Sequence, residues 1–146
     1  MSNTIKIKVL GDKELKKRLK DLSAEGKQEV TKQLNLNALD YVNSVRKSIR
    51  RNTGKYRPYK RGGRTHWSSR PGTPPNSDTG NLVRRIEVTR ISRNGKPAIV
   101  KSGAKYSAAL EFARKKKRKR PFMLPMLEAR RKLYTLRIKR AIRKLL

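Results

Sequence analysis

The chain has 146 residues, of which 41 are lysine or arginine and 10 are aspartate or glutamate, so its formal net charge is +31. Its hydrophobic fraction is 34% and it contains no cysteine. These values fit a single domain over residues 1–146 with a modest core. They exclude a disulfide framework and a thiolate metal site.

The apolar residues are too dispersed for a membrane protein. No apolar run approaches the ~20 residues that a membrane-spanning helix needs, and the N-terminus alternates polar and apolar residues where a signal peptide has a continuous apolar block. No amphipathic anchor rich in Trp and Phe is evident either. We therefore expect no export through a signal peptide and no membrane partner.

The positive charge is unevenly distributed. Residues 1–40 hold nine basic and six acidic side chains, whereas residues 41–146 hold thirty-two and four. Self-repulsion on this scale destabilises an isolated chain unless a polyanion or an acidic partner neutralises it. We expect the larger segment to lie against DNA, RNA or an acidic protein surface.

The first third of the chain predicts a strand and two helices. Ile5, Ile7 and Val9 alternate within Thr4–Leu10, as in a strand. Asp12 can then cap a short helix that runs through Leu15, Leu19 and Leu22. A longer helix opens at Ser23 or Glu25 and should stop near Arg51 to Gly54. Spacings of three and four give it one buried stripe, made of Val30, Leu34, Ala38, Tyr41 or Val42, Val45 and Ile49.

The segment Thr53–Ser77 shows no periodic pattern. It holds four prolines, four glycines, six basic residues and no carboxylate. A loop of this length inside a small domain is usually functional or disordered. We expect an extended loop over residues 53–77.

The next segment predicts a β-hairpin. NLVRR predicts a short turn of helix. A strand follows it, with Ile86, Val88 and, after a slip in register, Ile91 on one face. The Asn-Gly within Ser92–Lys96 is typical of a tight hairpin turn, and Pro97–Ser102 would be the return strand.

The last third predicts two helices separated by seven consecutive basic residues. Ala104–Ala113 reads as a short helix, and Pro121 suits the first turn of the final helix. The inward residues would be Tyr106, Ala109, Leu110 and Ala113 in the first helix, and Leu127, Tyr134, Ile138, Ala141 and Leu145 in the second.

These elements predict an α+β fold. A small antiparallel sheet, made of the N-terminal strand and the hairpin, would pack against the long central helix and the C-terminal helix. Two basic segments would lie outside this framework, the extended loop 53–77 and an arm over residues 113–121.

Asp78-Thr79-Gly80 matches the catalytic triplet of aspartic proteases, but its context does not. Polar Asn76-Ser77 precedes it, so the apolar strand that buries such a carboxylate is missing. We interpret Asp78 or Thr79 as the N-cap of the following helical turn. His66 is the only histidine, the carboxylates are scattered, and no nucleophile elbow or phosphate-binding loop is present. We expect no enzyme, no metal site and no cofactor.

Two basic segments are candidate contact sites. Lys55–Arg70 interleaves Tyr56, Tyr59 and Trp67 with cations, as single-stranded nucleic-acid binders do; equally, a mobile arm could dock these aromatics on a neighbouring subunit. The run RKKKRKR fits an import signal, a solvated basic tip or a loop that touches DNA phosphates. The predicted contacts with DNA or an acidic partner are Lys55, Arg57, Lys60, Arg61, Arg64, Arg70, Arg114, Lys115, Lys116, Lys117, Arg118, Lys119 and Arg120.

Two separated stretches together resemble a family of small neck and tail-completion proteins of long-tailed bacteriophages. RPGTPPNSDTGNLVRRI, residues 70–86, resembles that family's PG-x-PP…DTG-x-L-x-x-S-I segment. GAKYSAALEFARKKKRKRPFMLPMLEA, residues 103–129, resembles its Y-x-x-x-x-EFG…RPF-x-x-PAL segment. The chain departs from the family at Ala113, where Gly is usual, and in the wholly basic run before Arg120.

The resemblance implies a structural role in the junction that joins the DNA-filled head to the tail. The chain would form a ring around the DNA channel and bind neighbouring neck proteins, such as the portal-side connector, the tail terminator or the tail tube. Its location would be the virion, after synthesis in the host cytoplasm. Arg114–Arg120 would project as an arm from two anchored aromatics, Phe112 and Phe122. The implied interface or structural residues are Tyr56, Tyr59, Trp67, Pro71, Gly72, Pro74, Pro75, Asp78, Thr79, Gly80, Leu82, Tyr106, Glu111, Phe112, Pro121, Phe122 and Pro125.

A second hypothesis rests on composition. A basic nucleic-acid-binding protein of ribosomal or nucleoid type would also explain the charge and the aromatic-basic loop. It would not explain why the two motifs occur in this order. Steep, salt-sensitive affinity of the free chain for RNA or DNA would favour this second hypothesis.

Overall fold

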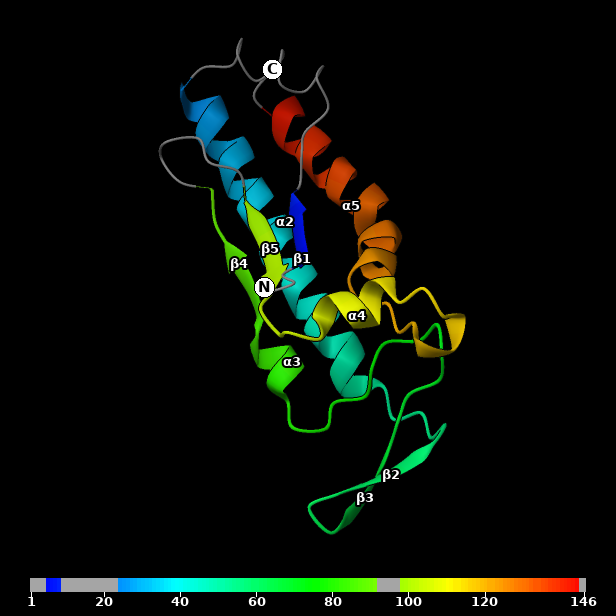
Figure 1. The fold of residues 1–146 in the computed structure, drawn as a ribbon. Coiled ribbons are helices and arrows are strands. Elements are labelled where there is room, and N and C mark those ends of the chain that lie inside the picture. The colour runs from blue at the N-terminus through cyan, green and yellow to red at the C-terminus, as the bar shows by residue number, and fades with distance from the viewer. Residues whose placement is uncertain (1–4, 9–23, 92–97, 145–146) are drawn as a thin grey trace.

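The computed structural model describes residues 5–8, 24–91 and 98–144. In chain order the elements are β1 (Ile5–Lys8), α2 (Ala24–Arg51), β2 (Pro58–Arg61), β3 (Arg64–Trp67), α3 (Asn81–Arg84), β4 (Ile86–Thr89), β5 (Ile99–Ser102), α4 (Ser107–Phe112), the 3₁₀ turn η1 (Lys116–Arg118) and α5 (Leu124–Arg143). Figure 1 shows α2 running through the molecule, the sheet and α5 beside it, and the β2–β3 hairpin projecting beyond the C-terminal end of α2.

The predicted α+β fold is confirmed. One antiparallel sheet has the order β1-β5-β4, so the N-terminal strand pairs with the later hairpin strands. In the register, Ile86 of β4 and Ile5 of β1 both lie opposite Ser102 of β5, and Val88 lies opposite Val100. The helix predicted after Asp12, the turn Ser92–Lys96 and Leu145 lie outside the described residues.

The buried stripe of α2 forms the centre of the core. Val30, Ala38, Tyr41, Val42, Val45 and Ile49 are buried as predicted, and Leu34 is half-buried. The part of the stripe from Ala38 to Ile49 packs with Leu82, Val83, Ile86 and Val100 from α3 and the sheet, and with Phe122 and Met123 before α5. Because β4 and β5 alternate, Ile86, Val88, Val100 and Ser102 share one face of the sheet.

The prediction for the start of α5 was wrong by one turn. The helix begins at Leu124, and Pro125, not Pro121, lies in its first turn. Phe122 and Met123, which precede the helix, are held by hydrogen bonds to a side chain of α4. The Glu111 side chain accepts hydrogen bonds from the backbone N–H groups of Phe122, Met123 and Leu124, at 2.8, 3.1 and 2.8 Å. Helix α5 is therefore capped by a carboxylate eleven or more residues away in the chain.

The inward face predicted for α4 was wrong at Tyr106 and Ala109, whereas Leu110 does pack against the core. The buried residues of α4 are the polar Ser107 and Glu111, whereas Tyr106 and Ala109 are exposed and Leu110 and Ala113 are half-buried. The core selects this face because Glu111 must reach the start of α5. Ser107 Oγ lies 2.5 Å from Ser102 Oγ of β5, so the second buried polar group is also hydrogen-bonded.

Polar contacts fix α5 against α2. Asp40 accepts hydrogen bonds from Arg130 Nη1 and from the Tyr134 hydroxyl, each at 2.9 Å. Burial, and then the hydrogen bond to Asp40, raise the pKa of Tyr134 above its usual value. Tyr41, the next residue of α2 after Asp40, donates to the carbonyl of Met123 at 2.7 Å, which ties the residue just before α5 to α2. Of the predicted inward residues of α5, Ala141 is buried and Leu127, Tyr134 and Ile138 are half-buried. Among the helices of the described residues, none is both long and apolar enough to span a membrane.

Candidate functional site

The segment predicted as an extended loop contains a β-hairpin. Strands β2 and β3 pair in antiparallel register from Pro58 opposite Trp67 to Arg61 opposite Arg64. Gly62 and Gly63 join them with φ angles of 55° and 73°. Positive φ at both central residues is typical of a type I′ turn, whose twist matches the two strands. We call residues 55–68 the ribbon, because every residue of β2 and most of β3 are exposed.

One face of the ribbon is held against Asp78. Arg61 Nη1 donates to Asp78 Oδ2 at 2.8 Å and the Tyr59 hydroxyl donates to the same oxygen at 3.3 Å. His66 Nδ1 lies 2.9 Å from Asp78 Oδ1, and the His66 ring stacks on Tyr59 with centroids 5.5 Å apart. Partial burial, and then the Asp78 charge, raise the pKa of Tyr59. Asp78 thus fastens the ribbon to the body of the protein.

The exposed aromatics of the ribbon are paired with cations. Lys55 Nζ lies 5.9 Å from the centroid of the Trp67 ring, and the Arg57 guanidinium lies 5.2 Å from that of Tyr56. Trp67 and Tyr56 are 38% and 37% exposed. Both pairs therefore present an aromatic surface and a positive charge together, which suits either of the two roles predicted for this segment.

Two asparagines hold the base of the ribbon. Asn76 Nδ2 donates to the carbonyls of Gly54 and Trp67, both at 2.8 Å, and so bridges the two ends of the ribbon. Asn52, just after α2, donates to the carbonyl of Pro74. Because these side chains satisfy loop carbonyls that no strand pairs, the ribbon leaves the body in a defined direction.

The prediction that Asp78 or Thr79 is the N-cap of α3 was wrong for the cap position, and of the two side chains only that of Thr79 accepts an N–H of the helix. The residue at the N-cap is Gly80, with φ of 71° and no side-chain cap bond. Thr79 Oγ1 accepts a long bond of 3.4 Å from the Asn81 N–H, one residue inside the helix. Asp78 is the only carboxylate between residues 41 and 86, and its oxygens are already occupied by the ribbon.

The proline-rich segment contacts the basic run. Arg70-Pro71-Gly72-Thr73 forms a β-turn, with the Thr73 N–H donating to the Arg70 carbonyl at 3.2 Å and φ of 79° at Gly72. The Gly72 N–H then donates to the Lys119 carbonyl at 2.9 Å. This turn therefore contacts the C-terminal end of the basic run through a backbone hydrogen bond.

Arg120 closes the basic run into a loop. Its guanidinium donates to the carbonyls of Ser69, Lys117 and Arg118, at 3.1, 3.3 and 3.0 Å. Arg120 therefore has structural partners, whereas residues 114–119 are all exposed. We call residues 114–119 the basic loop. Only one of the two expected aromatic anchors holds it, since Phe122 is buried and Phe112 is 59% exposed.

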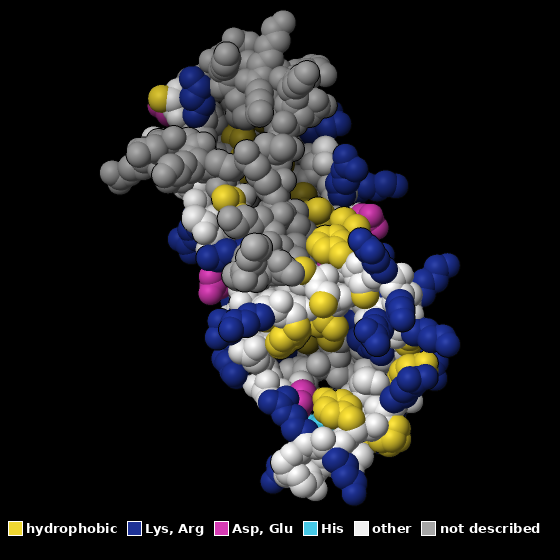
Figure 2. Space-filling model, in the orientation of Figure 1, with side chains coloured by type: hydrophobic (Ala, Val, Ile, Leu, Met, Phe, Trp, Pro, Cys, Tyr) yellow, Lys and Arg dark blue, Asp and Glu magenta, His cyan; other side chains and the backbone are white. Residues whose placement is uncertain are grey.

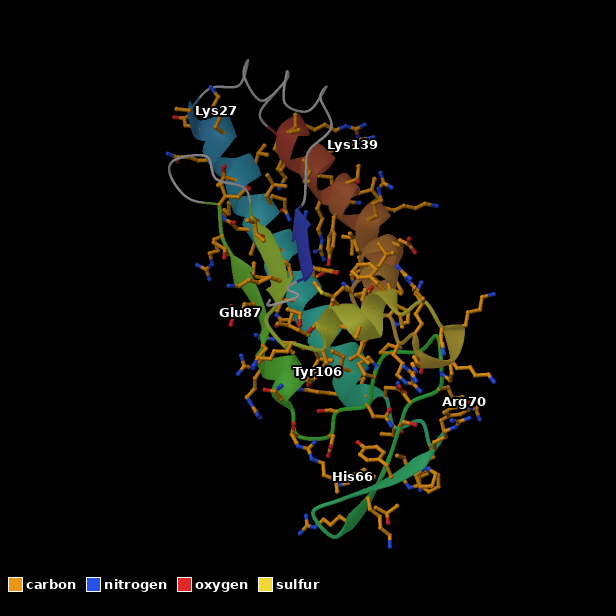
Figure 3. All side chains as sticks on the ribbon, in the orientation of Figure 1. Lys27, His66, Arg70, Glu87, Tyr106 and Lys139 are labelled. Carbon is orange, nitrogen blue, oxygen red and sulfur yellow. The ribbon has the colours of Figure 1, made fainter. Side chains whose placement is uncertain are left out.

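The predicted contact residues lie in the lower half of the molecule as drawn in Figure 1. The ribbon forms the lower end and η1 lies at the right, level with α4, and Figure 2 shows dark-blue side chains interleaved with yellow ones over this region. Figure 3 places His66 on the ribbon and Arg70 between the ribbon and η1. Of the residues implied by the motif resemblance, Pro75, Leu82, Glu111 and Phe122 are buried, so these four act within the fold.

Several residues of this site were not identified from sequence. The Gly62-Gly63 pair between two short runs with β-branched or aromatic residues is a hairpin signal that the high charge of the segment obscured. Asn52, Asn76 and His66 carry no local signal, because their partners are distant in the chain. Within the described ranges, no three His, Asp or Glu side chains lie close enough together to hold a metal ion.

Replacing Asp78 with asparagine should loosen the ribbon without unfolding the protein. The ion pairs are partly exposed, so we expect a loss of no more than about 1 kcal/mol in global stability. Amide hydrogen exchange in β2 and β3 should nevertheless accelerate, because local opening no longer breaks the bonds to Arg61 and His66. Glu87→Gln, which removes the exposed pair with Lys101 on the sheet, is the matched control. Unchanged exchange in the ribbon of Asp78→Asn would contradict this role.

Comparison of the whole chain with protein families, curated proteins and solved structures finds no match.

Proposed function

We propose that the chain is a non-enzymatic structural protein of the head–tail junction of a long-tailed bacteriophage. Copies of it would assemble into a ring around the DNA channel and bind the rings on either side. The ribbon and the basic loop would meet DNA in the channel or an acidic face of an adjacent ring. Its mechanism would be docking and sealing, with no chemical step.

One observation supports this proposal above the others. The two stretches that resemble the neck and tail-completion family are separated by residues 87–102, yet they contact each other through Gly72 and Lys119 and through Arg85 and Gly103. In the second stretch, Glu111 bonds the backbone at Phe122, so its two halves also depend on each other. These contacts are what is expected if the two stretches belong to one structural unit, and this is the sense in which they support the proposal.

The charge distribution is consistent with a docking surface. The ribbon, Arg70 and residues 114–120 together carry thirteen lysines and arginines, and the neighbouring Asp78 and Glu111 are both engaged within the chain. Unneutralised charge of one sign steers a protein toward a polyanion or an acidic surface and disfavours self-association through that end. The positive end is thus suited to face a partner of opposite charge.

A basic nucleic-acid-binding protein is the second candidate. It is favoured by the pairing of Lys55 with Trp67 and of Arg57 with Tyr56, because exposed aromatics beside cations suit the stacking of bases next to phosphate contacts. Steep salt dependence of binding by the free chain to single-stranded RNA or DNA would favour this candidate.

The first experiment is to purify intact particles from a producing culture and locate the chain by cryo-electron microscopy. Density for the chain between the portal region and the tail tube is the expected result. If the chain is absent from the particles and is recovered on RNA or host DNA, the junction role is wrong and the second candidate stands.

A further inference from the structure

Helix α4 buries two polar residues and leaves much of its apolar surface exposed. The buried Ser107 and Glu111 are four residues apart on one face, and their side chains bond β5 and the start of α5. Another stripe of the helix and its two caps carries Tyr106, Ala109, Leu110 and Ala113. Leu110 packs partly against the core, whereas Tyr106 and Ala109 are exposed, so the chain leaves this apolar stripe only partly covered.

This apolar stripe forms the floor of a hollow of about 390 Å³. Tyr106, Ala109, Leu110 and Ala113 line it on the helix side, and the other wall is the start of the basic loop, with Arg114, Lys115 and Arg118. Tyr106, at the centre of Figure 3, is 45% exposed. The hollow therefore combines an apolar floor with a cationic rim.

A second hollow of about 330 Å³ adjoins the first, because Tyr106 and Leu110 line both. Its lining is about half polar and half apolar, and comes mainly from residues 75–82 together with Arg61. Asp78, its only carboxylate, is already bonded to Arg61 and lies beside His66. The second hollow extends the first toward the ribbon and can accept the polar backbone of an extended segment.

From this arrangement we propose that the hollow between α4 and the basic loop binds an acidic, extended segment of a partner protein. One apolar side chain of that segment inserts beside Leu110, and its carboxylates pair with Arg114, Lys115 and Arg118. Insertion removes apolar surface on both partners from water. The carboxylates of the segment supply the negative charge that neutralises the cationic rim. The chain's own nearby carboxylates do not, because Glu111 is buried against α5 and Asp78 is held by the ribbon.

The lining favours a protein segment over nucleic acid and over a second copy of the chain. Bases stack on aromatic faces, but three of the four floor residues are aliphatic, and a phosphate backbone has no apolar group to place there. A second copy would bring further positive charge, because residues 41–146 hold thirty-two basic and four acidic side chains. The proposal rests on the junction role in one respect: if that role is correct, the partner is a neighbouring protein of the junction.

The test uses the purified full-length chain and two labelled decapeptides made of Asp and Glu, identical except for a central Leu or Ser. Binding is followed by fluorescence anisotropy at physiological salt. We expect the Leu peptide to bind about tenfold more tightly, from burial of one aliphatic side chain. Equal affinities would overturn the proposal, because attraction by charge alone does not distinguish the two peptides.

Filling the hollow is the matched structural test. Ala109→Trp places an indole on the apolar stripe of α4 without changing the charge, and should abolish the difference between the Leu and Ser peptides. Ala129→Trp, at an exposed alanine of α5, is the control and should preserve the difference. The proposal is wrong if Ala109→Trp leaves the difference between the two peptides intact. It is also wrong if Ala109→Trp lowers the affinity of the chain for duplex DNA as much as its affinity for the Leu peptide.

A charge variant keeps the proposal testable if Ala109→Trp fails to fold. Replacing Arg114, Lys115 and Arg118 with glutamine should weaken both peptides about tenfold, since three exposed ion pairs are lost. The same replacement at the exposed Arg131, Lys132 and Arg140 of α5 removes equal charge and should have a smaller effect. Equal losses would contradict a localised site. Absence of the chain from phage particles would overturn the junction role but not these results.

Discussion

Replacing Glu111 with alanine is expected to lower the free energy of unfolding by about 4 kcal/mol. The side chain is 1% exposed and accepts three backbone N–H groups at the start of α5. Each buried donor left without a partner costs about 1–3 kcal/mol, and the favourable charge at the helix N-terminus is lost as well. Urea denaturation followed by circular dichroism measures the change directly.

Two variants sharpen this prediction. Glu111→Gln keeps the shape and one carbonyl acceptor but turns an amide N–H₂ toward backbone donors, so a loss of about 2 kcal/mol is expected. Glu128→Gln, at an exposed carboxylate of α5, should change stability by no more than about 0.5 kcal/mol. A Glu111→Ala protein as stable as the parent chain would show that the cap does not hold α5 in place.

Replacing all six residues of the basic loop, 114–119, with glutamine is expected to spare folding and impair head–tail joining. These side chains are exposed, and removing six like charges relieves self-repulsion, so the urea midpoint should be unchanged or higher. Six exposed ion pairs of about 0.5 kcal/mol each correspond to docking about a hundredfold weaker. Counting tailless heads and joined particles by electron microscopy gives the readout.

The control for this variant is chosen to match its charge. Arg131, Lys132, Lys139, Arg140 and Arg143 of α5 and its C-cap Lys144 are also exposed, and replacing them with glutamine removes the same number of charges. Joining should then be less affected. Arg120 is left unchanged in both variants, because its guanidinium bonds the carbonyls of Ser69, Lys117 and Arg118. Unfolding of the basic-loop variant, or equal loss of joining in the two, would contradict the contact role.

The elements with a long periodic pattern were predictable from sequence. The stripe of α2, from Val30 to Ile49, recurs over about five turns, and its burial follows from helical geometry alone. Strands β4 and β5 alternate around a turn signal, and their register buries Ile86 and Val100 as the alternation requires. Both signals are local and repeat several times, so a single unfavourable residue does not obscure them.

The ribbon and α4 show where local patterns fail. In the ribbon, exposed strands have no buried face to impose alternation, and only Gly62-Gly63 marks the turn. In α4, the stripe of Tyr106, Ala109, Leu110 and Ala113 predicted burial that was wrong at Tyr106 and Ala109. Burial of Glu111 is favourable only because three N–H groups from a later segment converge on it, and no helical periodicity contains that information.

The sequence by itself determined the α+β class, the buried face of the long helix and the concentration of positive charge in residues 41–146. Periodicity and composition suffice for these properties, because they depend on which residues prefer water. Only the tertiary structure decided the role of Asp78 as the fastening of the ribbon and that of Glu111 as the cap of α5. It also decided which cations remain free, since Arg61 and Arg120 have partners within the chain and the basic loop is exposed. These roles depend on which polar groups meet after folding. The bonds of Asp78 to the ribbon, of Glu111 to Phe122 and of Arg120 to Ser69 join residues between 11 and 51 positions apart in the chain.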